Sequence, residues 1–347
     1  MPPDPAAPAT ARTQTWTRDP ALLAAFALLT ALVGFRLASW AAGSDVPPST
    51  LDRAGPLTQA LLPVVRLSAE LAALAVVAGL SVSLFTLGRV RDLWVVPALP
   101  RSVAGWAGTW AALALAWSLL SASDISNQPV VEVLRTGLVL EYLRIIPQAR
   151  TQAVAAALAL GVALLALMAP RVAGRGRLAV LGLMLAGTGT ALAYPLTVGH
   201  SASAANHQLA ITVLLVHVLA AAAWVGGLAG LVVHLRHGAM RLLPAVSRFQ
   251  VLALGAFAVV GASGVANAWT RVPDLATLTS TPYGWLLLAK AAALLVLGGF
   301  GAWHRRSTIR ALADGEAGAF QRLAAVEVLV MTATVGLAVA LSSTPTP

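Results

Sequence analysis

Long runs of apolar residues alternate with short polar segments along almost the whole chain. Each run has about 20 residues or more, which is enough for a helix rising about 1.5 Å per residue to cross about 30 Å of hydrocarbon. The pattern predicts an all-α polytopic membrane helix bundle with about nine transmembrane helices. The predicted helices cover residues 20–42, 63–87, 101–121, 149–169, 177–199, 208–234, 245–268, 283–303 and 322–342.

Composition favours a membrane protein over a soluble one. Hydrophobic residues make up 58% of the 347 residues and charged residues 10%, whereas a soluble domain averages about 25% charged residues. The net charge is +10, which in a soluble protein would suggest nucleic acid. Here the cations lie between apolar runs, so we expect no nucleic-acid partner. The absence of Cys excludes thiolate metal sites and thioether-linked haem.

The positions of the cations predict an orientation. With the N-terminus in the cytoplasm, fifteen of the 23 Lys and Arg residues fall in inside segments, five in outside segments and three within helices. Cytoplasmic loops carry an excess of cations, so we predict an N-in, C-out chain. Abundant Ala and Arg with a single Lys are typical of a GC-rich bacterial genome, which indicates the bacterial cytoplasmic membrane.

Three regions are expected along the chain. Residues 1–19, rich in Pro, Ala and Thr, are predicted to be a disordered cytoplasmic N-terminus. A composition shift near 170–177 predicts a four-helix N-terminal region, 20–176, and a five-helix C-terminal region, 177–347. Residues 122–148 mix charged and apolar side chains and predict a short amphipathic helix on the outer face.

Ionisable residues inside membrane helices are costly, so they are functional candidates. Arg66 and Glu70 are spaced i,i+4 on one helix face and can pair. Lys290 is expected about two turns inside the outer end of its helix, where it snorkels outward or pairs with Glu70. Glu327 is expected near the inner end of the last helix, solvated at the interface.

The six His residues all lie after residue 199. His200 and His207 flank an uncharged outer loop, and His217 lies inside the next helix. Neutral imidazole suits copper, zinc and haem iron, so we predict an outer metal site formed by His200, His217 and His207. The other three His residues lie beside Arg residues at the inner interface, where titrating surface His is ordinary.

Residues 199–342 resemble the CopD family of bacterial copper-resistance membrane proteins. The resemblance is carried by Gly199-His200, by VHVLAAAAWVGGL with His217 and Trp224, by GASGVANAW, and by TPYGWLLLAK with Tyr283 and Lys290. The chain is also similar to the front part of CopD–CtaG fusion proteins. The resemblance implies copper handling at the cytoplasmic membrane, usually uptake, in some members beside a periplasmic CopC-like copper-binding protein.

Three functions therefore compete. The first is a non-enzymatic copper binding and transport protein of the lipid bilayer, with Glu70, Arg66 and Lys290 tuning the charge and Trp224 and Tyr283 supporting the site. The second is a b-type haem protein, because His217 and His234 lie about 25 Å apart on one helix and bis-His ligation needs no Cys. The third is an assembly factor that delivers copper to a respiratory oxidase partner.

Overall fold

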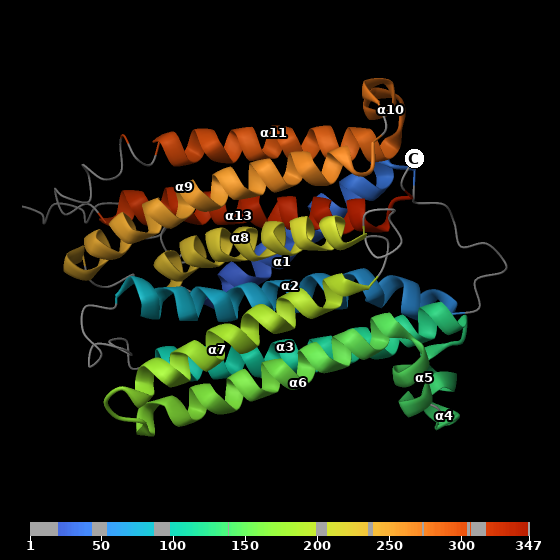
Figure 1. Cartoon of the computed structure of the whole chain (residues 1–347), viewed down its shortest axis with the longest axis horizontal. Helices are drawn as coiled ribbons and strands as arrows, with labels where there is room; N and C mark the ends of the chain where they lie inside the picture. The colour runs from blue at the N-terminus through green and yellow to red at the C-terminus, as the bar shows by residue number, and fades with distance from the viewer. Residues whose placement is uncertain are drawn as a thin grey trace, which may run out of the picture.

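The chain folds into a bundle of long helices that lie roughly along one axis (Figure 1). The computed structural model describes residues 20–43, 54–86, 98–137, 139–198, 207–234, 239–272, 274–303, 306 and 317–345. Within these ranges the regular structure is helical and contains no strand. Nine helices in this part of the chain are long and apolar enough to cross a membrane. The expected all-α bundle with about nine spans is confirmed.

The spanning helices lie at or near the predicted positions. They are α1 (Pro20–Ala41), α2 (Gly55–Phe85), α3 (Leu99–Ser126), α6 (Pro147–Met168), α7 (Gly176–Ala193), α8 (His207–His234), α9 (Ala239–Trp269), α11 (Pro282–Trp303) and α13 (Ala317–Ser343). Some helices begin earlier than the apolar pattern predicts. Both α2 and α9 start in a more polar segment and continue through an internal proline, Pro63 or Pro244.

Three short α-helices gather at one end of the bundle. Helices α4 (Val130–Arg135), α5 (Val139–Ile145) and α10 (Leu275–Ser280) lie at the same end as the C-terminus of α13 (Figure 1), and we call this the α10 end. One amphipathic helix was expected within 122–148, but α3 continues to Ser126 and two short helices follow. Asn127 and Gly137 adopt positive φ angles of 54° and 68°, which interrupts the helical path there.

Two large apolar clusters form the interior. The first joins α2, α3, α6 and α7 and includes Val76 and Leu80. The second joins α8, α9, α11 and α13 with the last turns of α2, including Val82 and Phe85. Helix α2 therefore belongs to both clusters, while α1 packs mainly along α13. The predicted division of the chain at 176 and 177 stays a prediction.

Small residues allow the backbones of some helices to approach closely, as is common between membrane helices. On α8, a Cβ at Gly226 would lie 2.6 Å from a methyl group of Val77, and one at Gly230 would lie 2.5 Å from the Ala78 carbonyl oxygen. Helices α2 and α8 both start at the α10 end and run in the same direction (Figure 1). These contacts fix their relative register.

Candidate functional site

The structure describes two of the three histidines predicted to form the outer metal site. His217 lies in α8, and His207 is the first residue of that helix, about 15 Å away along the axis. His200, His237 and His304 lie outside the described residues, and His234 ends α8 at the opposite end of the bundle. Among the described residues, no group of three or more His, Cys, Asp or Glu side chains could hold a metal ion. The meeting of His200, His207 and His217 stays a prediction.

His217 is joined to α9 by a hydrogen bond. Its Nδ1 atom lies 3.0 Å from the hydroxyl oxygen of Ser263. Ser263 is buried, 8% exposed, and its hydroxyl donates to the carbonyl oxygen of Val259 at 2.5 Å. A Cβ at Gly264 would lie 3.8 Å from the imidazole Cε1 atom, so the ring lies against the backbone of α9. The sequence identified His217 but not its partner.

Polar residues continue from Ser263 toward the α10 end along one side of α9. Asn267 follows Ser263 by four residues on α9, a spacing that places both side chains on one helix face. Arg271 lies just beyond the end of α9 at Trp269. The Asn267 Oδ1 atom is buried and has no hydrogen-bond partner in the described structure. Buried polar groups are nearly always hydrogen-bonded. The Asn267 oxygen can therefore accept a hydrogen bond from a water molecule or a polar ligand.

Lys290 of α11 adds positive charge to this region. It is half-buried and lies within electrostatic range of both His217 and Arg271. The sequence offered two roles for Lys290, snorkelling or pairing with Glu70. The Glu70 carboxylate instead accepts from its own helix, from Arg66 Nε at 3.2 Å.

The Arg66–Glu70 pair holds three helices together. Arg66 and Glu70 are 26% and 30% exposed, and the Arg66 Nη2 atom also donates to the hydroxyl of Ser342 on α13 at 2.7 Å. The guanidinium lies 5.3 Å from the ring centre of Trp117 on α3, a cation–π geometry. These contacts make the pair a link between α2, α3 and α13.

The charged pair and His217 occupy a similar depth in the bundle. Gly226 of α8 lies against Val77 of α2, and the two helices run in parallel (Figure 1). Counting back along α8 from Gly226 to His217, and by the same number of residues along α2 from Val77, reaches residue 68. His217 therefore lies level with the turn of α2 that contains Arg66 and Glu70. The polar groups of α2, α8 and α9 thus form one layer within the apolar bundle.

The two supporting aromatic residues pack in apolar surroundings. Trp224 is buried and meets Phe257 of α9 edge to face, with ring centres 5.7 Å apart. Tyr283 is buried at the start of α11 against Ala38 and Leu341. Their supporting role at the candidate site stays a prediction.

Glu327 departs from its sequence-based expectation. It was expected to be solvated at the inner interface, but it is 3% exposed. Its helix begins at Ala317, ten residues earlier in the chain, so the carboxyl lies about 15 Å along the helix rather than one turn from its end. The solvated interfacial position was wrong.

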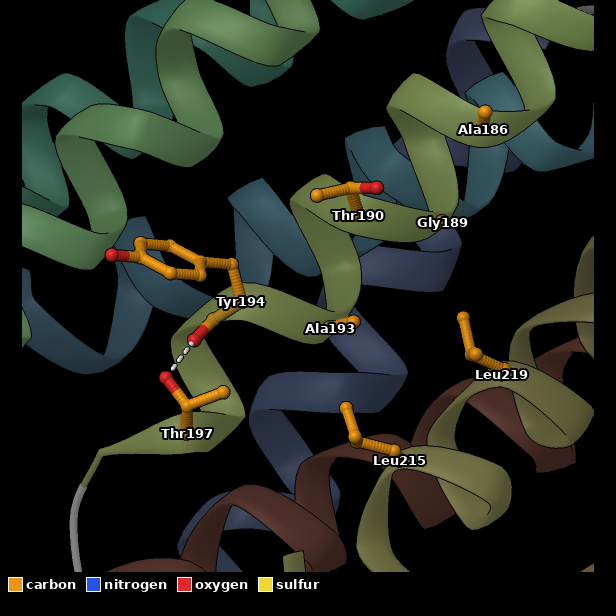
Figure 2. Close-up of a pocket in the computed structure, with 8 residues that line it drawn as sticks. All are labelled: Ala186, Gly189, Thr190, Ala193, Tyr194, Thr197, Leu215 and Leu219. Carbon is orange, nitrogen blue, oxygen red and sulfur yellow. Dashed lines mark hydrogen bonds between the residues drawn. The ribbon is translucent and has the colours of Figure 1, made fainter. Parts of the chain in front are cut away.

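A groove of about 440 Å³ runs between α7 and α8. Figure 2 shows Leu215 and Leu219 of α8 on one side and the small residues Gly189 and Ala193 on the other. Its lining contains no His or carboxylate. Residues two apart on a helix point in nearly opposite directions, so His217 lies on the other side of α8 from Leu215. The groove and the His217 site are separate.

The segment that contains Ser263 and Lys290 also matches a model of a known protein family. Residues 243–341 match the family model described as copper resistance protein D. No curated protein and no solved structure gives a significant match. The match runs from α9 to α13 and includes Ser263, Asn267, Arg271 and Lys290, whereas His217 precedes it. Over residues 243–341 the chain is therefore similar to copper resistance protein D, which confirms the expected resemblance for this segment and supports a general role in copper resistance or transport.

Proposed function

We propose that this chain binds copper and carries it across the bacterial cytoplasmic membrane in the direction of uptake. The observation that carries the proposal is His217, a histidine inside an apolar helix, hydrogen-bonded to Ser263 of the segment similar to copper resistance protein D. Polar and ionisable side chains inside a membrane commonly mark ion pathways. Copper is the cargo, and imidazole is a suitable ligand for it.

The arrangement suggests a path from the α10 end into the bundle. From Arg271, just beyond the end of α9, Asn267 and then Ser263 follow along the helix toward His217. His207 starts α8 about 15 Å from His217. This separation suits two successive copper-binding positions better than one copper ion bound by both residues. On this proposal His200 and His207 receive copper at the outer surface and His217 receives it inside. A periplasmic CopC-like protein would be a suitable copper donor.

The metal content of the purified protein tests this function directly. Copper and iron per chain are measured in protein from copper-supplemented cells. Near-stoichiometric copper without iron is expected. One or two irons per chain would instead support the b-type haem protein, with His217 and His234 as axial-ligand candidates.

The role of His217 is tested with a matched pair of variants. His217→Ala is expected to lower the bound copper while leaving yield and membrane insertion intact. His234→Ala changes the same residue type at the other end of the same helix and is the control. Equal copper in both folded variants would remove His217 from the site. Lost oxidase activity with unchanged cellular copper, after deletion of the gene, would favour the oxidase assembly factor.

A further inference from the structure

The hydroxyl of Ser263 has a single hydrogen, and its neighbours determine where that hydrogen points. The Ser263 Oγ atom lies 2.5 Å from the Val259 carbonyl oxygen, 3.3 Å from the Val260 carbonyl oxygen and 3.0 Å from His217 Nδ1. Carbonyl oxygens only accept hydrogen bonds. The hydroxyl therefore donates within α9, and toward His217 its oxygen acts as the acceptor.

This assignment fixes the protonation of the imidazole ring. If Ser263 Oγ accepts, His217 Nδ1 must carry the hydrogen of the bond. A neutral imidazole has one N–H and one lone pair, so the lone pair is on Nε2.

We propose that Ser263 is a positioning residue that holds His217 in the Nδ1–H tautomer and so presents Nε2 as the copper ligand. The proposal rests on the proposed function for its copper step. Metal-binding histidines usually donate their second ring N–H to a fixed acceptor, and loss of that acceptor typically weakens binding by about 10- to 100-fold. Ser263 supplies such an acceptor from a neighbouring helix.

The tautomer is tested without copper. The full chain, labelled with ¹⁵N-histidine and placed in lipid nanodiscs, is examined by NMR, and His217→Gln identifies the His217 signals. We expect a protonated Nδ1 and an unprotonated Nε2 in the wild-type protein and in Ser263→Thr, which keeps the hydroxyl. Ser263→Ala is expected to lose this fixed pattern.

A matched serine controls for general effects of removing a buried hydroxyl. Ser83 of α2 is buried and donates to the Gly79 carbonyl oxygen at 3.2 Å, the same i to i−4 bond that Ser263 makes. Ser83→Ala is expected to leave the His217 signals unchanged. Unchanged signals of the other histidines in Ser263→Ala would show that the variant is folded.

Copper affinity is then measured for the same set by competition of Cu⁺ with a chromogenic chelator. Ser263→Ala is expected to bind about 10- to 100-fold more weakly, with Ser263→Thr and Ser83→Ala close to wild type. If folded Ser263→Ala keeps both the tautomer and the affinity, the positioning role is wrong while the copper function stands. If His217→Ala binds Cu⁺ as the wild type does, the proposed copper site fails, and the NMR result alone decides whether Ser263 sets the tautomer.

Discussion

Gly336 of α13 lies directly against the backbone carbonyl oxygen of Ala31 on α1, closer than any side chain would allow. The contact is reciprocal, because Gly34 of α1 faces the carbonyl oxygen of Ala333 in the same way. Just before these contacts on both helices, Thr30 and Thr332 share a hydrogen bond of 2.7 Å. The two helices therefore meet backbone to backbone, and this interface depends on the absence of side chains at two positions.

Adding a methyl group at this interface is expected to force the helices apart. Gly336→Ala should lower the stability by about 1–3 kcal/mol, the usual cost of overpacking, as measured by thermal unfolding in detergent. Gly299→Ala is the control, because a Cβ at Gly299 meets nothing within 4 Å and Ala favours helix formation. A similar loss in both variants would contradict the close contact as its cause.

Removing the positive charge of Lys290 is expected to tighten copper binding. Lys290 lies within electrostatic range of His217, where it repels an incoming cation. At an effective dielectric constant near 20 such repulsion is worth about 1–2 kcal/mol, or about 5- to 30-fold in affinity. Chelator competition should show this gain for Lys290→Met but not for Lys290→Arg, which keeps the charge. Weaker binding by Lys290→Met would show that Lys290 assists copper in another way.

The orientation of the bundle can be read by thiol labelling, because the sequence contains no Cys. Thr279 is exposed on α10, and Ala173 is exposed in the connection between α6 and α7 at the other end. In intact cells a membrane-impermeant reagent should label Thr279→Cys, whereas Ala173→Cys should react only after the membrane is broken. The reverse pattern would overturn the N-in, C-out prediction.

Asp274 caps α10 and gives it a pH dependence. The backbone N–H and the hydroxyl of Thr277 both donate to its carboxylate at 2.7 Å, which lowers the pKa of Asp274 below its ordinary value. Its stabilising effect is therefore fully present above about pH 3.9, the ordinary Asp value, and is lost as the pH falls through the lower folded pKa.

The amide chemical shift of Thr277 should report this titration, with a midpoint below the ordinary Asp value. Asp274→Asn retains a capping side chain but cannot ionise, so its Thr277 shift should stay constant over the same range. A wild-type midpoint above the ordinary value would contradict the hydrogen-bonded carboxylate.

The spans were readable from the sequence because hydropathy is a local property of each segment. Helix ends were less readable, since the first turns of α2, from Gly55, are less apolar than the rest. The error at Glu327 has the same origin, because its depth depends on a helix start that the apolar pattern placed too late. The Arg66–Glu70 pair was readable because both residues lie on one helix.

The candidate site was only partly readable. A histidine within an apolar helix is conspicuous, so His217 could be found from its own surroundings. Its partner Ser263 could not be, because the contact depends on which faces of α8 and α9 meet. One signal was present: Ser263 and Asn267 are polar residues spaced i,i+4 in an otherwise apolar segment. That spacing marks a polar face but does not say which helix covers it.

The double membership of α2 has a consequence for how this protein could be divided. The segment similar to copper resistance protein D lies wholly within the later part of the chain, which invites its treatment as a transferable module. Yet Val77 and Ala78 of α2 form the surface against which Gly226 and Gly230 of α8 pack. A shortened chain beginning at residue 177 would keep the whole matched segment and lose that surface. The matched segment is therefore a poor choice for a minimal expressed fragment. Such a fragment should retain α2.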